Sequence, residues 1–274
     1  ARVGIIFPPD FSENLKRGDR AAVQVLVDAS DSMSSATAIA TANAIGLLKS
    51  QKFFIQKTQL ANIPYDIRVR PWYNPDGITA YYMVPAILGI IVTMTMVMMT
   101  AAAIVRERER GTLEQLMVTP IKSYELMLGK IIPYIGLGYL QITVALLVGA
   151  LVFHVPIQGS LLELYGLTLF FITASLGIGI LISNIAKNQM QAFQMSFFVL
   201  LPSIMLSGFL FPREAMPLIV QYIGDILPLT YYLVIIRGIV LKGIGFSYLI
   251  SQVAALLVFS VVLVTLSIIK FKKR

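Results

Sequence analysis

The chain has 274 residues, of which 57% are hydrophobic and 13% charged, and its mean hydropathy is +0.79; ordinary soluble domains, with about 25% charged residues, are thereby excluded. Its net charge is +8, but the basic residues form short clusters between apolar runs, which argues against nucleic acid as a partner. Because cysteine is absent and His154 is the single histidine, disulfides, thiolate chemistry and a histidine metal cluster are excluded as well, and we predict a membrane protein without a metal site.

The first 80 residues combine apolar runs with signals for a helix. Residues 2–7 (RVGIIF) and 21–28 (AAVQVLVD) are rich in β-branched side chains and indicate strands. Between them, Asp10 fits a helix N-cap, Glu13 follows three residues later, and Gly18 fits a C-cap. This order predicts a β-α-β arrangement at the start of the chain.

A longer helical pattern follows. Alanine, isoleucine, leucine and phenylalanine recur at helical spacing over 34–59, and residues 65–73 (YDIRVRPWY) alternate as an edge strand does. Two prolines and a glycine in 71–80 indicate a linker into the next apolar run. We therefore predict a small α/β domain with its linker over 1–80.

The turn after the second predicted strand contains Asp28, Ser30 and Ser32. Their D-x-S-x-S spacing matches a metal-ion pattern of von Willebrand A domains, in which oxygen ligands hold a hard cation. An aspartate and serines between a strand and a helix also serve as ordinary turn and N-cap residues. We favour the turn interpretation and assign no metal ligand here.

Five charge-free intervals are long enough to cross a membrane, because a helix needs about 20 apolar residues to span the bilayer core. A charge at the middle of the bilayer would cost about 2.5–3.5 kcal/mol even on an insertion scale. The predicted spans, some extended over flanking residues, are 81–105, 126–153, 161–186, 188–212 and the helix that opens 243–274.

Small residues inside the spans permit helices to approach closely. Gly136 and Gly138 lie in the second span, and Ser175 and Gly179 lie in the third. We interpret them as packing residues rather than as substrate contacts.

The interval 213–242 differs from the spans, because Glu214, Asp225 and Arg237 divide it into apolar pieces that are too short to cross a bilayer. Pieces of this length fit re-entrant or interfacial helices. A structured extracytoplasmic loop is the alternative.

The basic clusters predict the orientation of the spans. They lie in the connection after the first span, at Lys187 and in the tail 270–274, and alternating spans place all three on one side, which the positive-inside rule makes the cytoplasm. Residues 1–80 are then extracytoplasmic. Since no export signal is visible before them, we expect a further transmembrane helix upstream of Ala1, which makes six in the complete protein.

The connection after the first span, 106–125, begins with five alternating charges. Its first two arginines fit the headgroup boundary, where long basic side chains reach water. Glu107 and Arg110 are spaced i, i+3, as are Arg106 and Glu109. We predict that these charges pair along the helix itself.

A second short helix is predicted directly afterwards. Gly111 permits a bend, Thr112 with Gln115 forms a T-x-x-Q capping box, and Pro120 ends the segment. The apolar side chains on one face of this helix are Leu113, Leu116 and Met117. These features fit either an interfacial anchor or a helix that offers one face to a partner.

The stretch RERERGTLEQLMVTPIKSYELMLGK resembles the signature of the permease subunits of type-2 ATP-binding-cassette exporters, typically E-[RK]-E-x-G-T-[LM]-E-x-L-x-x-[ST]-P. The matching positions are Glu107, Arg108, Glu109, Gly111, Thr112, Glu114, Leu116, Thr119 and Pro120. The similarity extends to IFPPDFSENLKRGDRAAVQVLVDAS and to LSGFLFPREAMP, so it covers nearly the whole chain. The chain is most similar to the bacterial branch with multidrug or unknown substrates.

In that family a coupling helix follows the second membrane helix and docks into a groove of the ATPase subunit. The resemblance implies this role for Glu107, Arg108, Glu109, Arg110, Gly111, Thr112, Leu113, Glu114, Leu116, Thr119 and Pro120. The chain has no G-x-x-x-x-G-K-[ST] loop, so ATP and magnesium are expected on a separate subunit, with no cofactor and no enzyme activity in this chain. The substrate-contacting residues stay unknown.

The resemblance implies a mainly α-helical polytopic protein of the bacterial plasma (inner) membrane, with a small extracytoplasmic α/β domain and a cytoplasmic tail. Expected partners are the ATPase subunit, a second permease subunit in a homo- or heterodimer, and the lipid bilayer; a periplasmic adaptor protein is left open. The small number of ionisable groups in the predicted spans favours an amphiphilic or apolar substrate that moves out of the cytoplasm or inner leaflet.

Two other classes of function were weighed. A membrane-anchored sensor with an extracytoplasmic ligand domain is the main alternative, although the sequence shows no signalling domain. A membrane hydrolase would need a catalytic set, and the predicted spans carry neither histidine nor paired carboxylates.

Overall fold

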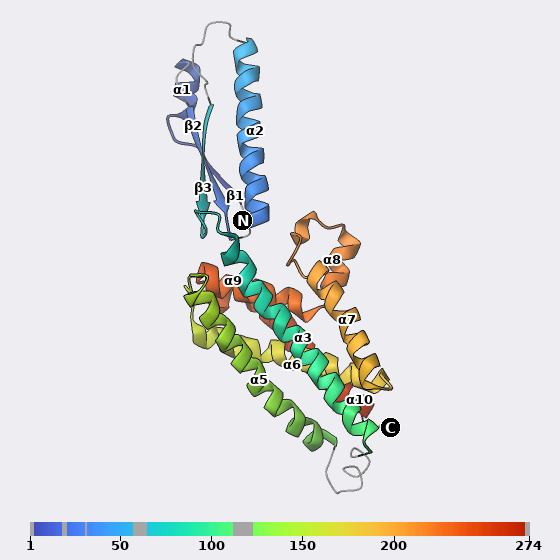
Figure 1. Cartoon of the computed structure of the whole chain (residues 1–274). Helices are drawn as coiled ribbons and strands as arrows, with labels where there is room; N and C mark the ends of the chain where they lie inside the picture. Colours follow the sequence, from blue (N-terminus) through green and yellow to red (C-terminus); the bar gives the residue numbers. More distant parts are fainter. Residues whose placement is uncertain (1–2, 18–20, 31, 57–64, 112–122, 272–274) are drawn as a thin grey trace. The chain divides into compact units, whose positions relative to one another are not determined.

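The computed structural model of the chain describes residues 3–17, 21–30, 32–56, 65–111 and 123–271 (Figure 1). The chain divides into two compact units, Ala1–Tyr82 and Met83–Arg274. The division falls within the first turns of the helix that begins at Thr79.

In its described part, the first unit has a three-stranded sheet in the order β1-β2-β3 and two helices. Its elements are β1 (Val3–Ile6), α1 (Phe11–Arg17), β2 (Ala21–Asp28), α2 (Ser32–Gln56) and β3 (Tyr65–Trp72). β2 and β3 are parallel, from Ala21 opposite Tyr65 to Asp28 opposite Trp72, and the long helix α2 connects them. Parallel strands need such a crossover connection, and here a helix supplies it.

The strand, helix and strand predicted at the start of the chain are present as β1, α1 and β2, but the two strands are not a parallel pair. β1 pairs antiparallel with β2, with Val3 opposite Val27. α1 has seven residues and so rises only about 10 Å, whereas the 25 residues of α2 rise about 37 Å. Only α2 is long enough to return the chain along the whole of β2, so the parallel pair forms with β3.

Burial alternates along β2, as expected for a strand with one covered face. Val23, Val25 and Val27 are buried, while the residues between them are half-buried. Their apolar neighbours are Phe11, Ala38, Ile39, Ala42, Ile67 and Val69. The core of the first unit therefore lies between β2, its neighbour β3 and the two helices.

The turn after β2 is closed by its own aspartate. The Asp28 carboxylate accepts hydrogen bonds from the backbone N–H of Ser30 at 3.1 Å and from the Ser30 hydroxyl at 2.6 Å. This is the local side-chain bonding of an Asx-type turn. The carboxylate Oδ1 of Asp28 and the hydroxyl of Ser30 therefore take part in the turn.

The second unit is helical in its described part. Its elements are α3 (Thr79–Glu109), α5 (Ser123–Leu151), α6 (Leu161–Ile185), α7 (Gln189–Leu206), η1 (Arg213–Ala215), α8 (Leu218–Gly224), α9 (Pro228–Lys242), η2 (Phe246–Tyr248) and α10 (Ile250–Phe271). Five helices among the described residues are long and apolar enough to cross a membrane: α3, α5, α6, α7 and α10. The five spans expected from the sequence are thereby confirmed as membrane-span candidates.

Helix α6 lies at the centre of this unit. Its most hydrophobic stretch is 67% buried, against 22% for α5, α7 and α10. A Cβ placed on Gly177 would lie 2.9 Å from the Cβ of Leu263 in α10, and the Ser267 hydroxyl of α10 donates to the Gly177 carbonyl at 3.1 Å. Small residues thus let the backbone of α6 come into direct contact with neighbouring helices.

Three of the four small residues singled out in the sequence lie at helix contacts. A Cβ on Gly179 would lie 2.8 Å from the Val97 carbonyl oxygen of α3, and one on Gly138 would lie 2.7 Å from Cδ1 of Ile172. Ser175 is buried. A Cβ on Gly136 would meet nothing within 4 Å, so the structure gives Gly136 no packing role.

Two membrane helices have limits that differ from those indicated by hydropathy alone, and a glycine with left-handed backbone lies near each of these limits. α7 ends at Leu206, before the predicted limit of 212, and Gly208 follows with φ 87°. α10 begins at Ile250 rather than at 243, because Gly243, with φ 63°, is the C-cap of α9. Both turns need a backbone conformation that glycine adopts without strain.

The interval 213–242 forms two helices rather than one straight span. α8 and α9 meet at an angle of 85° across a short break. Arg213 pairs with Asp225 at 2.5 Å, and Arg237 donates to the Gly208 carbonyl at 3.1 Å. Two of the charges that divide this interval in the sequence, Asp225 and Arg237, therefore have partners in the segment that precedes α8.

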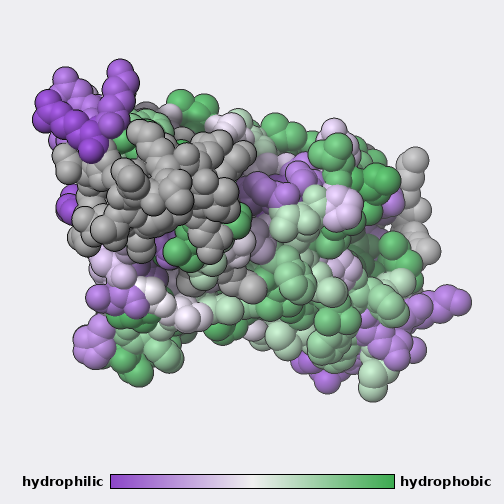
Figure 2. Space-filling model, turned by 90° about the horizontal axis from the view of Figure 1, so that it is seen from above, coloured by the Kyte–Doolittle hydropathy of each residue, from purple (hydrophilic) through white to green (hydrophobic). Residues whose placement is uncertain are grey.

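The surface of the second unit is rich in apolar side chains. Leu140 of α5 is 60% exposed, Phe198 of α7 78%, and Val258 of α10 57%. Figure 2, a view of the whole chain from above, shows hydrophobic residues interspersed with hydrophilic ones. Side chains of this kind suit helices that face lipid.

Candidate functional site

The structure describes five of the eleven residues that the sequence assigns to function. Glu107, Arg108 and Glu109 form the last turn of α3, and Arg110 and Gly111 follow. The remaining six lie outside the described residues: Thr112, Leu113, Glu114, Leu116, Thr119 and Pro120. We refer to residues 106–111 as the α3 end.

Gly111 turns the chain at the α3 end. Its φ is 71°, and its backbone N–H donates to the Arg108 carbonyl at 3.1 Å, while the N–H of Arg110 donates to Arg106 at the same distance. A left-handed residue at this position is a common way for a helix to stop. The bend expected from the sequence is therefore present in the backbone.

Arg108 binds the carboxyl end of α6. Its guanidinium donates to the Ser183 carbonyl at 3.1 Å and to the Ala186 carbonyl. The last carbonyls of a helix lack partners within the helix, and its end carries partial negative charge. The planar fork of an arginine satisfies two such oxygens at once.

Glu109 binds the amino end of α7. One carboxylate oxygen accepts the backbone N–H of Gln189 at 3.0 Å, and the other accepts the Gln189 side-chain amide at 2.5 Å. Gln189 is the first residue of α7, and the preceding Asn188 caps the helix through the N–H of Gln191. A carboxylate is favoured at this positive helix end.

Arg106 reaches the same glutamine from the other side. Its Nε donates to the Gln189 Oε1 at 3.1 Å, so the side-chain amide of Gln189 uses its oxygen for Arg106 and its nitrogen for Glu109. Arg106 and Glu109 are one turn apart on α3 and therefore face the same way. Figure 1 shows the two elements side by side, with the end of α3 beside the start of α7.

Glu107 connects the α3 end to α5. Its carboxylate forms an ion pair with the ammonium group of Lys130, and the two side chains are 34% and 17% exposed respectively. A partly buried pair is screened less by salt than one on the open surface. The α3 end thus contacts α5, α6 and α7 through three consecutive residues.

A hydrophobic cluster underlies these polar contacts. Its buried members come from α3, α6, the turn after α6 and α7: Val97, Ala101, Val105, Ile182, Ala186 and Ala192. Next to it, Gly179 brings α6 against the backbone of α3. Packing and polar contacts therefore hold the same three helices together at this end.

The partners of the α3 end differ from those expected. The sequence predicted pairs within the helix, whereas the described contacts of Arg106, Arg108 and Glu109 go to α6 and α7. Sequence analysis missed Gln189, which lies 80 residues from Glu109. A local signal did exist, since Lys187, Asn188 and Gln189 form a polar turn between two apolar helices.

Three consecutive side chains of the α3 end bind neighbouring helices. Among the described residues, no group of three or more histidines, cysteines, aspartates or glutamates could hold a metal ion. Arg108 and Glu109 are engaged with helix ends, and Glu107 is engaged with Lys130. Such contacts fix the position of a segment relative to the helices around it.

Two pairs of polar side chains join neighbouring helices. Thr95 of α3 donates to Gln141 of α5 at 2.8 Å, and Thr168 and Tyr232 are 3.1 Å apart. The Tyr232 ring stacks on Phe171 with ring centroids 3.9 Å apart. These pairs reduce the cost of burying polar groups away from water.

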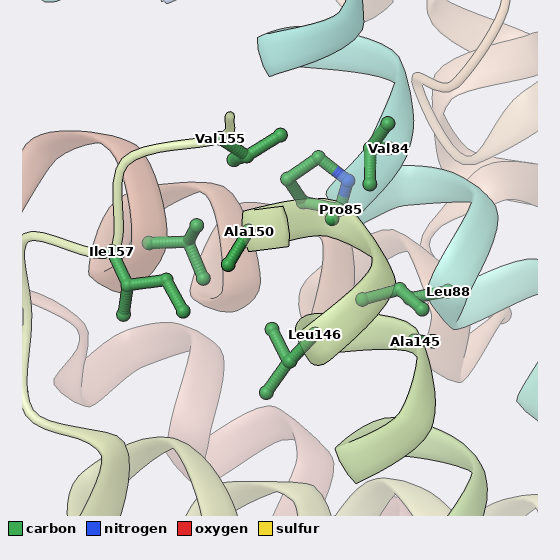
Figure 3. Close-up of a pocket in the computed structure, with 10 residues that line it drawn as sticks. Val84, Pro85, Leu88, Ala145, Leu146, Ala150, Val155 and Ile157 are labelled. Atoms are coloured by element: carbon green, nitrogen blue, oxygen red, sulfur yellow. The ribbon is translucent and has the colours of Figure 1, made fainter. Parts of the chain in front are cut away.

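A small apolar pocket lies between α3, α5 and the loop that follows α5 (Figure 3). Figure 3 shows Pro85 and Leu88 of α3 facing Leu146 and Ala150 of α5, with Val155 closing one side. None of the side chains that line it is polar. It offers no group that would orient a polar ligand.

Similar proteins are found among membrane transporters. The family described as ABC-2 family transporter protein matches residues 2–269. YbhS of Escherichia coli (strain K12), a probable multidrug ABC transporter permease, is 33% identical over 272 residues, 98% of this chain and 72% of the relative. YbhR of the same strain, with the same description, is 31% identical over 92% of this chain and 68% of its own. ABC transporter G family member 20 of Dictyostelium discoideum is 27% identical over 79% of this chain and 31% of its own.

Proposed function

The chain belongs to the ABC-2 transporter family, and from that membership we propose that it exports an amphiphilic or apolar substrate with energy from ATP hydrolysis on a separate subunit. It is a membrane permease of the ABC type. The direction of transport, the substrate and the coupling to ATP are the parts that we add.

The α3 end is the observation that supports coupling. It directly precedes the residues that resemble the family's coupling helix, and it is joined to α5, α6 and α7 by polar contacts and packing. A displacement of residues 112–120 by the ATPase subunit would therefore be transmitted to several membrane helices at once. A segment that merely rested on the membrane would not need these connections.

The substrate class rests on two observations. The relatives YbhS and YbhR are described as probable multidrug permeases. In this chain, the polar groups described above within the helices pair with each other, as Thr95 does with Gln141. We propose a substrate with a large apolar surface, taken from the cytoplasm or from the inner leaflet.

The proposal includes an assembly and an orientation. Residues 1–80 lie outside the cytoplasm and the basic tail lies inside, because the basic clusters favour this arrangement. An ATPase subunit binds at the α3 end and residues 112–120. A second permease subunit, identical or related, completes the membrane part, and an adaptor protein outside the membrane is a further partner to test.

Purification of the full-length protein from its native membranes tests the proposal. We expect an ATPase with a nucleotide-binding loop to co-purify. The complex in inverted vesicles should accumulate ethidium, used as an amphiphilic probe, when ATP is added and should not accumulate it with a non-hydrolysable analogue. A complex that hydrolyses ATP without moving ethidium would count against the multidrug class. Absence of any ATPase partner would count against the function itself.

A further inference from the structure

The amide group of Gln189 occupies a specific position between two charged residues of α3. Its nitrogen donates to Glu109 at 2.5 Å and its oxygen accepts from Arg106 at 3.1 Å, while its backbone N–H donates to Glu109 at 3.0 Å. An amide carries a donor and an acceptor on separate atoms, as this arrangement requires. A carboxylate at this position would face the carboxylate of Glu109.

The turn that precedes Gln189 is also held from its other side. Arg108 binds the carbonyls of Ser183 and Ala186 at the end of α6. Only 186–188 separate α6 from α7. Both helix ends that meet at this turn are therefore bound to consecutive residues of α3, over a shared apolar cluster.

We propose that Gln189 is a positioning residue of the coupling apparatus, through which the α6–α7 turn moves together with the α3 end as one body. This inference rests on the proposed function, because it concerns how movement of residues 112–120 enters the membrane. Charge-assisted hydrogen bonds at two helix ends resist separation more strongly than neutral contacts do. Movement of residues 112–120 then displaces α6 and α7 as well as α3 and α5.

Distance measurement between two spin labels tests this inference directly. The chain has no cysteine, so Arg110→Cys with Lys187→Cys creates a unique labelled pair on two exposed side chains, one on each side of the contact. In the complex with the ATPase subunit, we expect one narrow distance distribution that stays in place when ATP replaces the nucleotide-free state. A shift of about 5 Å, roughly one helical turn, would overturn the inference.

Substitutions at the glutamine separate positioning from general stability. Gln189→Glu sets a carboxylate against Glu109, and we expect the distance distribution to broaden. Adding Glu109→Gln exchanges donor and acceptor and should narrow it again. Gln191→Glu is the matched control, because residue 191 uses its side-chain oxygen to accept from the Lys187 N–H at 2.7 Å and a carboxylate can do the same.

The outcomes separate this inference from the proposed function. An unchanged distribution in Gln189→Glu, or equal broadening in Gln191→Glu, would overturn the role of Gln189 even in a complex that transports. Failure of any ATPase subunit to bind the unsubstituted protein would instead overturn the proposed function. The comparison of Gln189→Glu with Gln191→Glu in nucleotide-free protein would still decide whether Gln189 holds the turn.

Discussion

Arg108 and Glu109 are neighbours in the chain, yet they serve helix ends of opposite polarity. The cation lies at the carboxyl end of α6 and the anion at the amino end of α7. Each placement agrees with the polarity of the helix dipole. The order of the two residues therefore matters as much as their charges.

Gly111 gives a first prediction at the residue scale. With φ at 71°, a residue that carries a Cβ is strained by about 1–2 kcal/mol. Gly111→Asn should keep ethidium transport, because asparagine tolerates this conformation; Gly111→Ala should reduce it. Gly111→Pro should abolish it, since proline fixes φ near about −65° and has no N–H for the Arg108 carbonyl. Transport per amount of membrane-inserted protein is the measurement, and normal transport by Gly111→Pro would contradict the prediction.

Two glycines make a matched pair for packing. Gly179→Ala places a carbon 2.8 Å from the Val97 carbonyl, and such overpacking costs about 1–3 kcal/mol. Gly136→Ala meets nothing within 4 Å and should be neutral or stabilising by about 0.5–1 kcal/mol in a helix. Thermal unfolding of the detergent-solubilised protein should show a lower Tm for Gly179→Ala alone. Equal Tm values for the two variants would refute the close contact between α3 and α6.

Among the elements, the membrane helices were the most predictable from the sequence. Their position follows from long intervals without charge, a property that each residue carries regardless of its neighbours. Their ends were less predictable, because Gly208 and Gly243 stop helices through a left-handed φ that hydropathy does not reveal. The antiparallel direction of β1 was not predictable from local patterns, since strand pairing depends on the reach of α1 and α2.

The α3 end was predictable only in part. Its charges and the bend at Gly111 are visible in the sequence as a motif. The partner of Arg106 is 83 residues away, and Ser183 contributes a backbone carbonyl, which every residue possesses. Such partners depend on how α6 and α7 pack, and no local pattern contains that information.

The segment 112–120, outside the described residues, carries a prediction at the element scale. If Glu114 faced only lipid headgroups, Glu114→Lys would strengthen attachment by about 1 kcal/mol. If it faces the ATPase subunit, the same change costs about 2–5 kcal/mol; the lower end of that range is roughly 30-fold in affinity. We expect the second outcome, measured as loss of ATPase binding and of ethidium transport.

The control for this substitution is Glu214→Lys, which makes the same charge change at an exposed residue after α7. In the proposed orientation residue 214 lies on the far side of the membrane from the ATPase subunit. The Glu214→Lys variant should therefore bind the ATPase subunit as the unsubstituted protein does. Normal transport by Glu114→Lys would return the segment to the role of a membrane anchor.

At the scale of the whole molecule, the orientation of the helices can be tested in the same cysteine-free chain. Ser160 lies just before α6 and Lys187 just after it, and both are exposed. In intact cells that express the full-length protein, an impermeant maleimide should label Ser160→Cys and should reach Lys187→Cys only after the membrane is opened. The reverse pattern would invert the proposed topology.

The central place of α6 also bears on the order in which the chain matures during synthesis. Its Gly177 carbonyl is bound by Ser267, which lies 90 residues later. At a synthesis rate of about 5–20 residues per second, the ribosome reaches Ser267 of α10 roughly 5–18 s after it has made Gly177. During that interval one side of α6 borders lipid or the insertion machinery, and the surface at Gly177 has no helix packed against it. Helix α10 is therefore needed to complete the interior around α6, so a ribosome that stalls before α10 would release a chain with its most buried helix still exposed.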